Sequence, residues 1–315
     1  MANKLKVLVT GGAGFIGSHV AEELLKKDFK VVAIDNCVTG FERNIPIGVR
    51  FYKMDLNDAM LESVFEKERP DYIIHLAAQA SVIASMKDPY LDFFTNTAGT
   101  VKVLQLSKKY NVKKFLFSST AAVYGEPSYL PIDENHLIHA KSFYALSKYS
   151  AENYINYYSI YNGLDSCILR FSNVYGPRQS EDGEAGVISI FVNRLLANKK
   201  VCIYDGSQTR DFIYVKDVAI ACSLALVGEV KGTINISSCS ETSIEDLYYQ
   251  IAKVTGTNAE PLYEPRRIGE IGKSILDNQR ARSELGWTTQ YSLSEGLQET
   301  VKYYSKRYLA TKVKI

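Results

Sequence analysis

Short runs of β-branched and other apolar residues alternate with longer stretches in which apolar positions recur at helical spacing. The short runs predict strands and the longer stretches predict helices. Because the strand-like runs are apolar on both faces and alternate with helices, they predict a parallel sheet covered on both sides. Right-handed crossovers make this a doubly wound, Rossmann-type α/β fold. We expect strands at residues 6–10, 30–34, 72–76, 114–118 and 166–171, and helices at 19–27, 58–68, 98–110 and 143–161.

The pattern changes after the sequence VYGP at 174–177, where the polar, glycine-containing stretch 179–186 indicates a surface loop. A strand-like run at 232–237 is expected to return to the main sheet. Residues 244–256 and 293–308 are expected to form peripheral helices. We therefore predict a larger domain and a smaller C-terminal α/β lobe, formed respectively by residues 1–171 with 210–236, and by residues 172–209 with 237–315.

Composition and charge fit a globular protein that binds a small ligand. The 315 residues are 46% hydrophobic and 23% charged, which excludes long disordered or coiled-coil segments as the main architecture. Lys and Arg number 37 against 35 Asp and Glu, and this net charge of +2 is too small for a protein dedicated to nucleic acid or to a membrane surface. The longest uncharged stretch, 72–86, is too short to span a bilayer, and the N-terminus has no secretion-signal pattern. We expect a cytoplasmic protein.

Neither disulfide bonds nor a metal site is predicted. His136 and His139 are three residues apart, but the nearby Pro131 indicates a loop rather than a helix that would hold a metal pair. His19 and His75 are expected to be structural. The cysteines are odd in number, scattered and without a CxxC pair, so we expect them in the core: Cys37, Cys167, Cys202, Cys222 and Cys239.

A glycine motif, Gly12-x-Gly14-x-x-Gly17, follows the first predicted strand. Such glycines allow a tight turn and let backbone N–H groups approach a pyrophosphate at a helix N-terminus. Asp35, about 20 residues later, is placed to bind the ribose 2′-hydroxyl of NAD and to repel the 2′-phosphate of NADP. Asp55 could accept from the adenine amino group, although a loop carboxylate is as often a cap. In isolation the motif could be a plain glycine-rich turn, but its β-α-β context favours NAD.

Two further motifs carry groups for proton transfer. Tyr144 and Lys148 are four residues apart in a predicted helix, so they share one face. A tyrosine needs about 4 kcal/mol of phenolate stabilisation to act as a base near pH 7, which Lys148 and a positive nicotinamide ring could supply together. Thr120, in the segment 118–125 at a strand end, could relay the proton. In isolation the same residues could be an interfacial tyrosine, a surface lysine and a hydroxyl cap.

Together these motifs identify the chain as a member of the extended short-chain dehydrogenase/reductase family, within which it resembles the UDP-galactose (UDP-hexose) 4-epimerases over nearly its whole length. The resemblance implies an NAD-dependent isomerase that interconverts UDP-hexoses through a transient 4-keto sugar and needs no metal. It rests on TGGAGFIG at 10–17, DN at 35–36, HLAAQ at 75–79, SSTAAVYG at 118–125, YALSK at 144–148, RFSNVYGPR at 170–178 and RDF at 210–212.

The resemblance also implies the site residues. Tyr144 would take the proton of the C4 hydroxyl, Lys148 would lower the pKa of Tyr144 and orient the nicotinamide ribose, and Thr120 would position O4. The arginines of the smaller lobe would clamp phosphate and ribose, unless they are ordinary surface arginines. NAD would be bound by Gly11, Gly14, Phe15, Ile16, Gly17, Asp35, Asn36, Asp55, Leu56, Ala77, Ala78, Gln79, Asn96, Tyr144, Lys148 and Phe171. The UDP-sugar would be bound by Ser81, Thr120, Asn173, Val187, Tyr204, Arg210, Arg267, Glu270 and Ser274.

Two places in the sequence separate neighbouring activities. Dehydratases of the family carry an Asp-Glu pair after the catalytic threonine and UDP-glucuronate decarboxylases carry a Glu nearby, whereas this chain has Ala121 and Ala122. Without that extra acid or base, the 4-keto sugar is expected to take the hydride back, which favours epimerisation. Narrow-specificity epimerases place a large aromatic residue where this chain has Ser274. The small side chain predicts that UDP-GlcNAc and UDP-GalNAc are accepted besides UDP-Glc and UDP-Gal.

Two alternatives stay open. One is a UDP-glucuronate 4-epimerase, or another nucleotide-sugar dehydratase or decarboxylase of the family. The other is a non-catalytic NAD-sensing protein, although such proteins typically lose the tyrosine or the lysine and both are present here. The resemblance also implies a homodimer, in which the helices at 98–110 and 143–161 form a four-helix contact between subunits.

Overall fold

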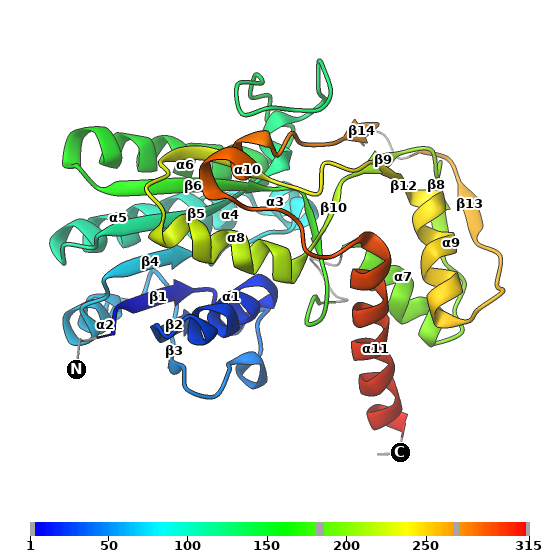
Figure 1. The fold of residues 1–315 in the computed structure, drawn as a ribbon, viewed down its shortest axis with the longest axis horizontal. Coiled ribbons are helices and arrows are strands. Elements are labelled where there is room, and N and C mark those ends of the chain that lie inside the picture. The colour runs from blue at the N-terminus through cyan, green and yellow to red at the C-terminus, as the bar shows by residue number, and fades with distance from the viewer. Residues whose placement is uncertain (1–3, 181–185, 267–270, 313–315) are drawn as a thin grey trace.

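The computed structural model describes residues 4–180, 186–266 and 271–312, and one seven-stranded sheet forms its centre (Figure 1). Every pairing in this sheet is parallel. The strand order is β11-β6-β5-β4-β1-β2-β3. Successive strands are added outward in one direction from β1 to β3 and in the other from β4 to β11, which confirms the Rossmann-type α/β fold. The strands are β1 (Lys6–Thr10), β2 (Lys30–Asp35), β3 (Arg50–Lys53), β4 (Tyr72–His75), β5 (Lys114–Thr120), β6 (Asp165–Phe171) and β11 (Gly232–Ile236).

Helices cover both faces of the sheet, and each face has its own buried apolar cluster. On one face the cluster includes Val20 and Leu24 of the first helix and the indole of Trp287, whose N–H donates to the Asp217 carbonyl (3.0 Å). On the other it includes Phe65 and Leu104. This two-sided burial explains why the strands appear as continuous apolar runs in the sequence. The first face carries α1 (Phe15–Lys26), α8 (Val215–Val227) and α10 (Gln279–Leu285), and the second carries α2 (Leu61–Glu68), α5 (Gly99–Lys109) and α6 (Phe143–Asn162).

Two helices begin at residues other than those predicted. α1 begins at Phe15, inside the glycine motif rather than at residue 19, because Gly14 has an extended backbone and serves as the N-cap. α2 begins at Leu61 rather than at residue 58. The carboxylate of Asp58 accepts from the backbone N–H of Met60 (2.8 Å), which forms a turn ahead of the helix.

The remaining helices of the C-terminal half form a second core beside the sheet (Figure 1). α7, α9 and α11 meet there through residues such as Phe191, Tyr248 and Leu297. The division into two lobes stays a prediction; Tyr214 belongs to this second core, and Trp287 belongs to the core of the sheet. The elements are β7 (Asn173–Tyr175), α7 (Val187–Leu196), β8 (Cys202–Tyr204), β9 (Thr209–Arg210), β10 (Phe212–Tyr214), β12 (Thr242–Ser243), α9 (Ile244–Thr255), β13 (Leu262–Glu264), β14 (Lys273–Ser274) and α11 (Leu293–Lys312).

Shorter helices connect the strands near their carboxyl ends. The chain is π-helical at Phe94–Ala98 (η2), immediately before α5. A π-helical turn inside a longer helix is uncommon and often marks a functional site. The other short helices are η1 (Glu42–Asn44), α3 (Val82–Lys87), α4 (Pro89–Phe93) and η3 (Ala121–Tyr124).

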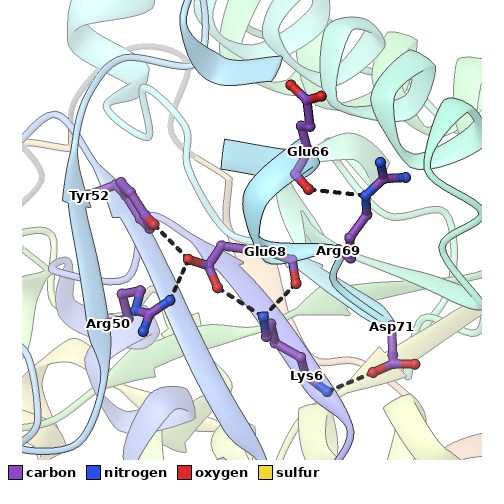
Figure 2. A network of polar contacts seen from close by, with 7 residues as sticks. All are labelled: Lys6, Arg50, Tyr52, Glu66, Glu68, Arg69 and Asp71. Atoms are coloured by element: carbon purple, nitrogen blue, oxygen red, sulfur yellow. Dashed lines mark hydrogen bonds and ion pairs between the residues drawn. The ribbon is translucent and has the colours of Figure 1, made fainter. Parts of the chain in front are cut away.

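A network of polar contacts ties α2 to the edge of the sheet (Figure 2). The carboxylate of Glu68 is buried and accepts from Lys6 (2.9 Å), Arg50 (2.8 Å) and Tyr52 (2.6 Å). Burial opposes ionisation, but these three donors outweigh it and hold the pKa of Glu68 at about 2. The Glu68 carboxylate therefore stays ionised at any pH well above that value.

The cysteines do not all lie where we expected them. Cys167 and Cys222 are buried, whereas Cys37, Cys202 and Cys239 are partly exposed, so the prediction of five core cysteines is wrong for three. Cys37 and Cys239 lie in loops, and Cys202 is the first residue of β8, outside the main sheet. Within the described ranges no cluster of His, Cys, Asp and Glu could hold a metal ion, and no helix is long and apolar enough to cross a membrane.

Candidate active site

A cavity of about 280 Å³ lies at the carboxyl ends of the central strands, at the point between β1 and β4 where the strand order reverses. Ligands of open α/β sheets bind at this position. Eleven of the residues predicted to bind NAD line it: Gly11, Gly14, Phe15, Ile16, Gly17, Asp35, Asn36, Asp55, Leu56, Ala77 and Ala78. Twelve further residues of the described lining were not predicted to bind NAD. Four of them, Val174, Arg178, Gln179 and Ser180, come from a segment far along the chain, and nothing local to them indicates that they face the glycine turn.

The glycine turn has no room for side chains. Gly11 has a φ of +69°, and a Cβ there would lie 2.8 Å from the backbone nitrogen of Ala77. A Cβ on Gly17 would lie 2.0 Å from the carbonyl oxygen of Gly11. No side chain of the described residues caps α1, and its first turn holds no acidic residue. The cradle therefore presents a helix N-terminus with uncapped N–H groups to the cavity, which suits the diphosphate of NAD.

Asp35 braces the glycine turn and carries its carboxylate to the cavity. Its oxygens accept from the backbone N–H groups of Ala13 (3.0 Å) and Cys37 (2.7 Å). Burial raises the pKa of Asp35, and these backbone donors oppose the rise. Beside it, the Asn36 amide donates to the carboxylate of Asp55 (2.8 Å), so two of the residues predicted to bind NAD lie in direct contact.

The groups predicted to transfer protons gather around the end of β5. Tyr144 is partly buried in the first turn of α6, and Lys148 is buried one turn later on the same helix. α6 packs against β5 and η3, and Thr120 ends β5 with its hydroxyl accepting from the Ala122 N–H (3.1 Å). The predicted position of a hydroxyl at a strand end, beside the helix of the tyrosine and lysine, is thus confirmed.

Lys148 is an unusually acidic ammonium. Its Nζ lies 4.4 Å from the ring centroid of Phe117. Burial lowers the pKa of Lys148 to about 8, although the carboxylates of Glu152 and Asp92 act to raise it. At neutral pH the side chain is still mostly charged, as the stabilisation of a phenolate requires.

Gln79 and Asn96 lie outside the lining of the cavity. They hold the turn of α6 from Tyr144 to Lys148, which we call the catalytic turn after its predicted role. The Asn96 side chain accepts from the Gln79 N–H (2.8 Å) and donates to the Gln79 carbonyl (2.9 Å) and the Ser147 hydroxyl (3.0 Å). Ser147 in turn donates to the carbonyl of Tyr144 (3.0 Å). Asn96 lies in the π-helical turn, and its amide also donates to the carboxylate of Asp92 (3.1 Å), so this turn directs one amide into four hydrogen bonds. Contact of Gln79 and Asn96 with NAD stays a prediction.

A buried ion pair lies beneath the catalytic turn. Arg170 donates through Nε and Nη2 to the carboxylate of Glu152 (3.0 and 2.6 Å), which also accepts from the Ser119 hydroxyl (2.5 Å). The remaining Nη1 donates to the hydroxyl of Tyr124 (2.9 Å). The guanidinium is therefore paired on every nitrogen. Phe171, the next residue, is buried opposite Thr120 in the β5–β6 pairing.

Three residues predicted to bind the substrate come together from separate segments. Arg210 of β9 pairs in parallel with Ser274 of β14, and the N–H of Asn173 donates to the carbonyl of Asp211 (2.9 Å). The fully buried Asp211 carboxylate accepts from Ser238 and from the N–H of Leu276 (3.2 Å), which fixes β14 beside β9.

The other predicted substrate residues occupy scattered positions. Val187 begins α7 and Tyr204 ends β8. Ser81 is buried and caps α3, because its hydroxyl accepts from the Ala84 N–H (3.1 Å). Arg267 and Glu270 lie outside the described residues.

Comparison with known proteins places this site in a family. The NAD dependent epimerase/dehydratase family matches residues 7–237. A UDP-glucose 4-epimerase of Mycolicibacterium smegmatis is 38% identical, with 96% of this chain and 99% of that protein covered. The crystal structure of UDP-glucose 4-epimerase with UDP-glucose from Thermotoga maritima is 42% identical, with a TM-score of 0.94 and coverage of 96% of this chain and 100% of that chain.

A third similar protein, UDP-N-acetylglucosamine 4-epimerase of Methanobrevibacter ruminantium, was solved in complex with UDP-N-acetylmuramic acid. It is 36% identical, with a TM-score of 0.92 and coverage of 97% of this chain and 99% of that chain. The family match runs through both the glycine turn and the tyrosine–lysine pair, so the chain belongs to the NAD dependent epimerase/dehydratase family, with NAD as its cofactor.

Proposed function

We propose that this chain is an NAD-dependent 4-epimerase of UDP-hexoses. The observation that carries the proposal is the placement of Tyr144, Lys148 and Thr120 around the end of β5, beside a cavity whose cradle suits NAD. The names of the similar proteins support the substrate class. Ala121 and Ala122 follow Thr120 in η3, so these two positions offer no acid or base for dehydration or decarboxylation.

The residues of the site perform the proton transfers. NAD, when bound, supplies reversible hydride acceptance. The ammonium of Lys148 stabilises the phenolate of Tyr144, which removes the proton of the C4 hydroxyl and becomes a neutral phenol. The Thr120 hydroxyl already accepts from Ala122, which leaves its own hydrogen free to donate to O4. After the sugar has turned over in the pocket, the same phenol returns the proton and the opposite configuration results.

The smaller lobe holds the nucleotide in this proposal. Arg210 contacts the diphosphate and Asn173 lies beside it, while Tyr204 flanks the uracil. Arg267 and Glu270 complete the set by resemblance. The pairing of β9 with β14 supports this arrangement because it places Ser274 next to Arg210, at the position where the sugar meets its diphosphate.

Substrate conversion tests the function directly. We expect purified protein to interconvert UDP-Gal with UDP-Glc and UDP-GalNAc with UDP-GlcNAc, as measured by chromatographic separation of the products. Conversion of UDP-GlcA alone would instead identify a uronate epimerase. Bound NAD without turnover of any UDP-sugar would support the sensor and overturn the proposal.

Enlarging Ser274 should narrow the substrate range. In Ser274→Tyr a phenol occupies the space that the N-acetyl group needs, so we expect turnover of UDP-GalNAc to fall at least about tenfold relative to UDP-Gal. The measurement is kcat/KM for both substrates. Ser274→Ala serves as the control and should leave the ratio unchanged. An equal loss on both substrates would contradict the role of Ser274.

We also propose a cytoplasmic homodimer. Exposed apolar side chains gather on α6 and on the neighbouring α4 and η2, which leads into α5. Large apolar side chains exposed on neighbouring helices are typical of a contact between proteins. The exposed side chains are Tyr157, Ile160 and Tyr161 on α6, and Tyr90, Leu91, Phe93 and Phe94 on α4 and η2.

A further inference from the structure

Arg178 lines the cofactor cavity. It follows β7 in the chain, yet it lines the same cavity as Gly14, Phe15 and Ile16 of the glycine turn. Its φ of +71° is rare for a residue other than glycine. The backbone here is held in an uncommon conformation, which sets the direction of the arginine side chain.

Two residues of α1 clamp this segment. The guanidinium Nη2 forms an ion pair with the carboxylate of Glu22. The ring Nε2 of His19 lies 3.0 Å from the carbonyl of Pro177, 158 residues away in the sequence. Burial and the nearby charge of Arg178 lower the pKa of His19 to about 4, so the ring is neutral at pH 7 and its Nε2–H donates to this carbonyl. Arg178 is therefore fixed to the helix whose N-terminus forms the anion cradle.

One donor of the clamped guanidinium is left over. Nη1 of Arg178 is buried and has no hydrogen-bond partner in the described part of the chain. A buried, charged donor without an acceptor is costly, and native proteins keep such groups mainly where a ligand supplies the acceptor. Since Nη1 belongs to a residue that lines the cavity next to the uncapped start of α1, the missing acceptor has the chemistry of an anionic oxygen.

We propose that Arg178 binds the diphosphate of NAD, with Nη1 donating to a phosphate oxygen while Nη2 stays on Glu22. The inference rests on the proposed NAD-dependent function and adds a charged ligand to the backbone cradle. It also joins the two halves of the site, because Arg178 continues the segment that carries Asn173. A bound cofactor thereby fixes the strand that is proposed to hold the substrate diphosphate.

The test compares ligands with and without phosphate. Dissociation constants of NAD, ADP and adenosine are measured by calorimetry on the full chain and on Arg178→Met. We expect ADP and NAD to bind about 10- to 100-fold more weakly to the variant, since a hydrogen bond to a charged group is lost, while adenosine binding stays within about twofold. Arg178→Gln, which keeps N–H donors without the charge, should show the same selectivity with a smaller loss. It also replaces the Met variant if that one does not fold.

Arg194→Met is the matched control. Arg194 is exposed on α7, is not among the residues that line the cavity and donates to the Lys200 carbonyl (2.8 Å), so its replacement should change none of the three constants. Unchanged ADP binding by the Arg178 variants, or an equal loss of ADP and adenosine, would overturn the inference. Weaker UDP binding with normal ADP binding would assign Arg178 to the substrate instead. If the wild type epimerises UDP-Gal and the Arg178 variants bind ADP normally, this inference is refuted and the proposed function stands. If the wild type binds neither NAD nor ADP, both the inference and the proposed function are refuted.

Discussion

Tyr144→Phe is expected to lower kcat for UDP-Gal by about 100- to 10,000-fold while NAD remains bound. The substitution removes only the phenolic oxygen, which is the general base of the proposed reaction, and general acid–base groups contribute rate factors of this size. Lys148, one turn further along α6, keeps its buried position because its surroundings do not change. The measurements are turnover of UDP-Gal and the NAD content of the purified variant.

Tyr154→Phe controls for the loss of a tyrosine hydroxyl on the same helix. Tyr154 is 48% exposed and lies away from the catalytic turn, so its variant should retain full activity. Retained turnover in Tyr144→Phe would remove Tyr144 from its role. Loss of NAD together with activity would show that the phenol acts through cofactor binding.

Glu152→Gln is expected to destabilise the protein by about 3 kcal/mol. Arg170 is buried, and the substitution leaves its guanidinium without a counter-ion, which is among the most costly changes in a protein interior. The carboxylate of Glu152 also acts to raise the pKa of Lys148, so its neutralisation should shift that pKa below about 8. The free energy of unfolding in urea measures the first effect, and the pH dependence of kcat measures the second.

Two further variants test whether the loss of stability comes from the unpaired Arg170. Glu66→Gln neutralises an exposed carboxylate and should change stability by less than about 0.5 kcal/mol. The double variant Glu152→Met, Arg170→Met removes both charges and should recover much of the lost stability, because no buried charge is left unpaired. If Glu152→Gln unfolds at the same urea concentration as Glu66→Gln, the ion pair does not stabilise the fold.

Periodicity alone predicts six of the seven strands of the central sheet, because these strands are buried on both faces and their apolar runs have sharp ends. The run 232–237 illustrates this: it returns as β11 beside β6, as predicted. Periodicity missed β3, an edge strand whose residues are partly or fully exposed. The ends of helices were harder to predict. The start of α2 after Asp58 and the π-helical turn at Phe94–Ala98 depend on local hydrogen bonds, which a hydrophobic pattern does not reveal.

The residues of the candidate site also divide into those that the sequence predicts and those that it does not. The glycine turn, Asp35 and the tyrosine–lysine pair have fixed spacings along the chain, so the sequence alone predicts them. Arg178 reaches the cavity only because distant segments pack against α1. It ends the motif at 170–178 that helps to identify the family, but nothing in that motif indicates contact with the glycine turn. Glu152 and Arg170 would each be expected on the surface, since charged residues are rarely buried unless they are paired.

The late return of β11 has a consequence for synthesis on the ribosome. β6 is complete at Phe171, but its outer neighbour β11 is complete only at Ile236, after α7, α8 and four short strands have been translated. A nascent chain therefore exposes the open edge of β6 throughout that interval, when another unpaired strand can add to it. Slowed elongation between these two points would lengthen the period in which the emerging polypeptide is most prone to aggregate.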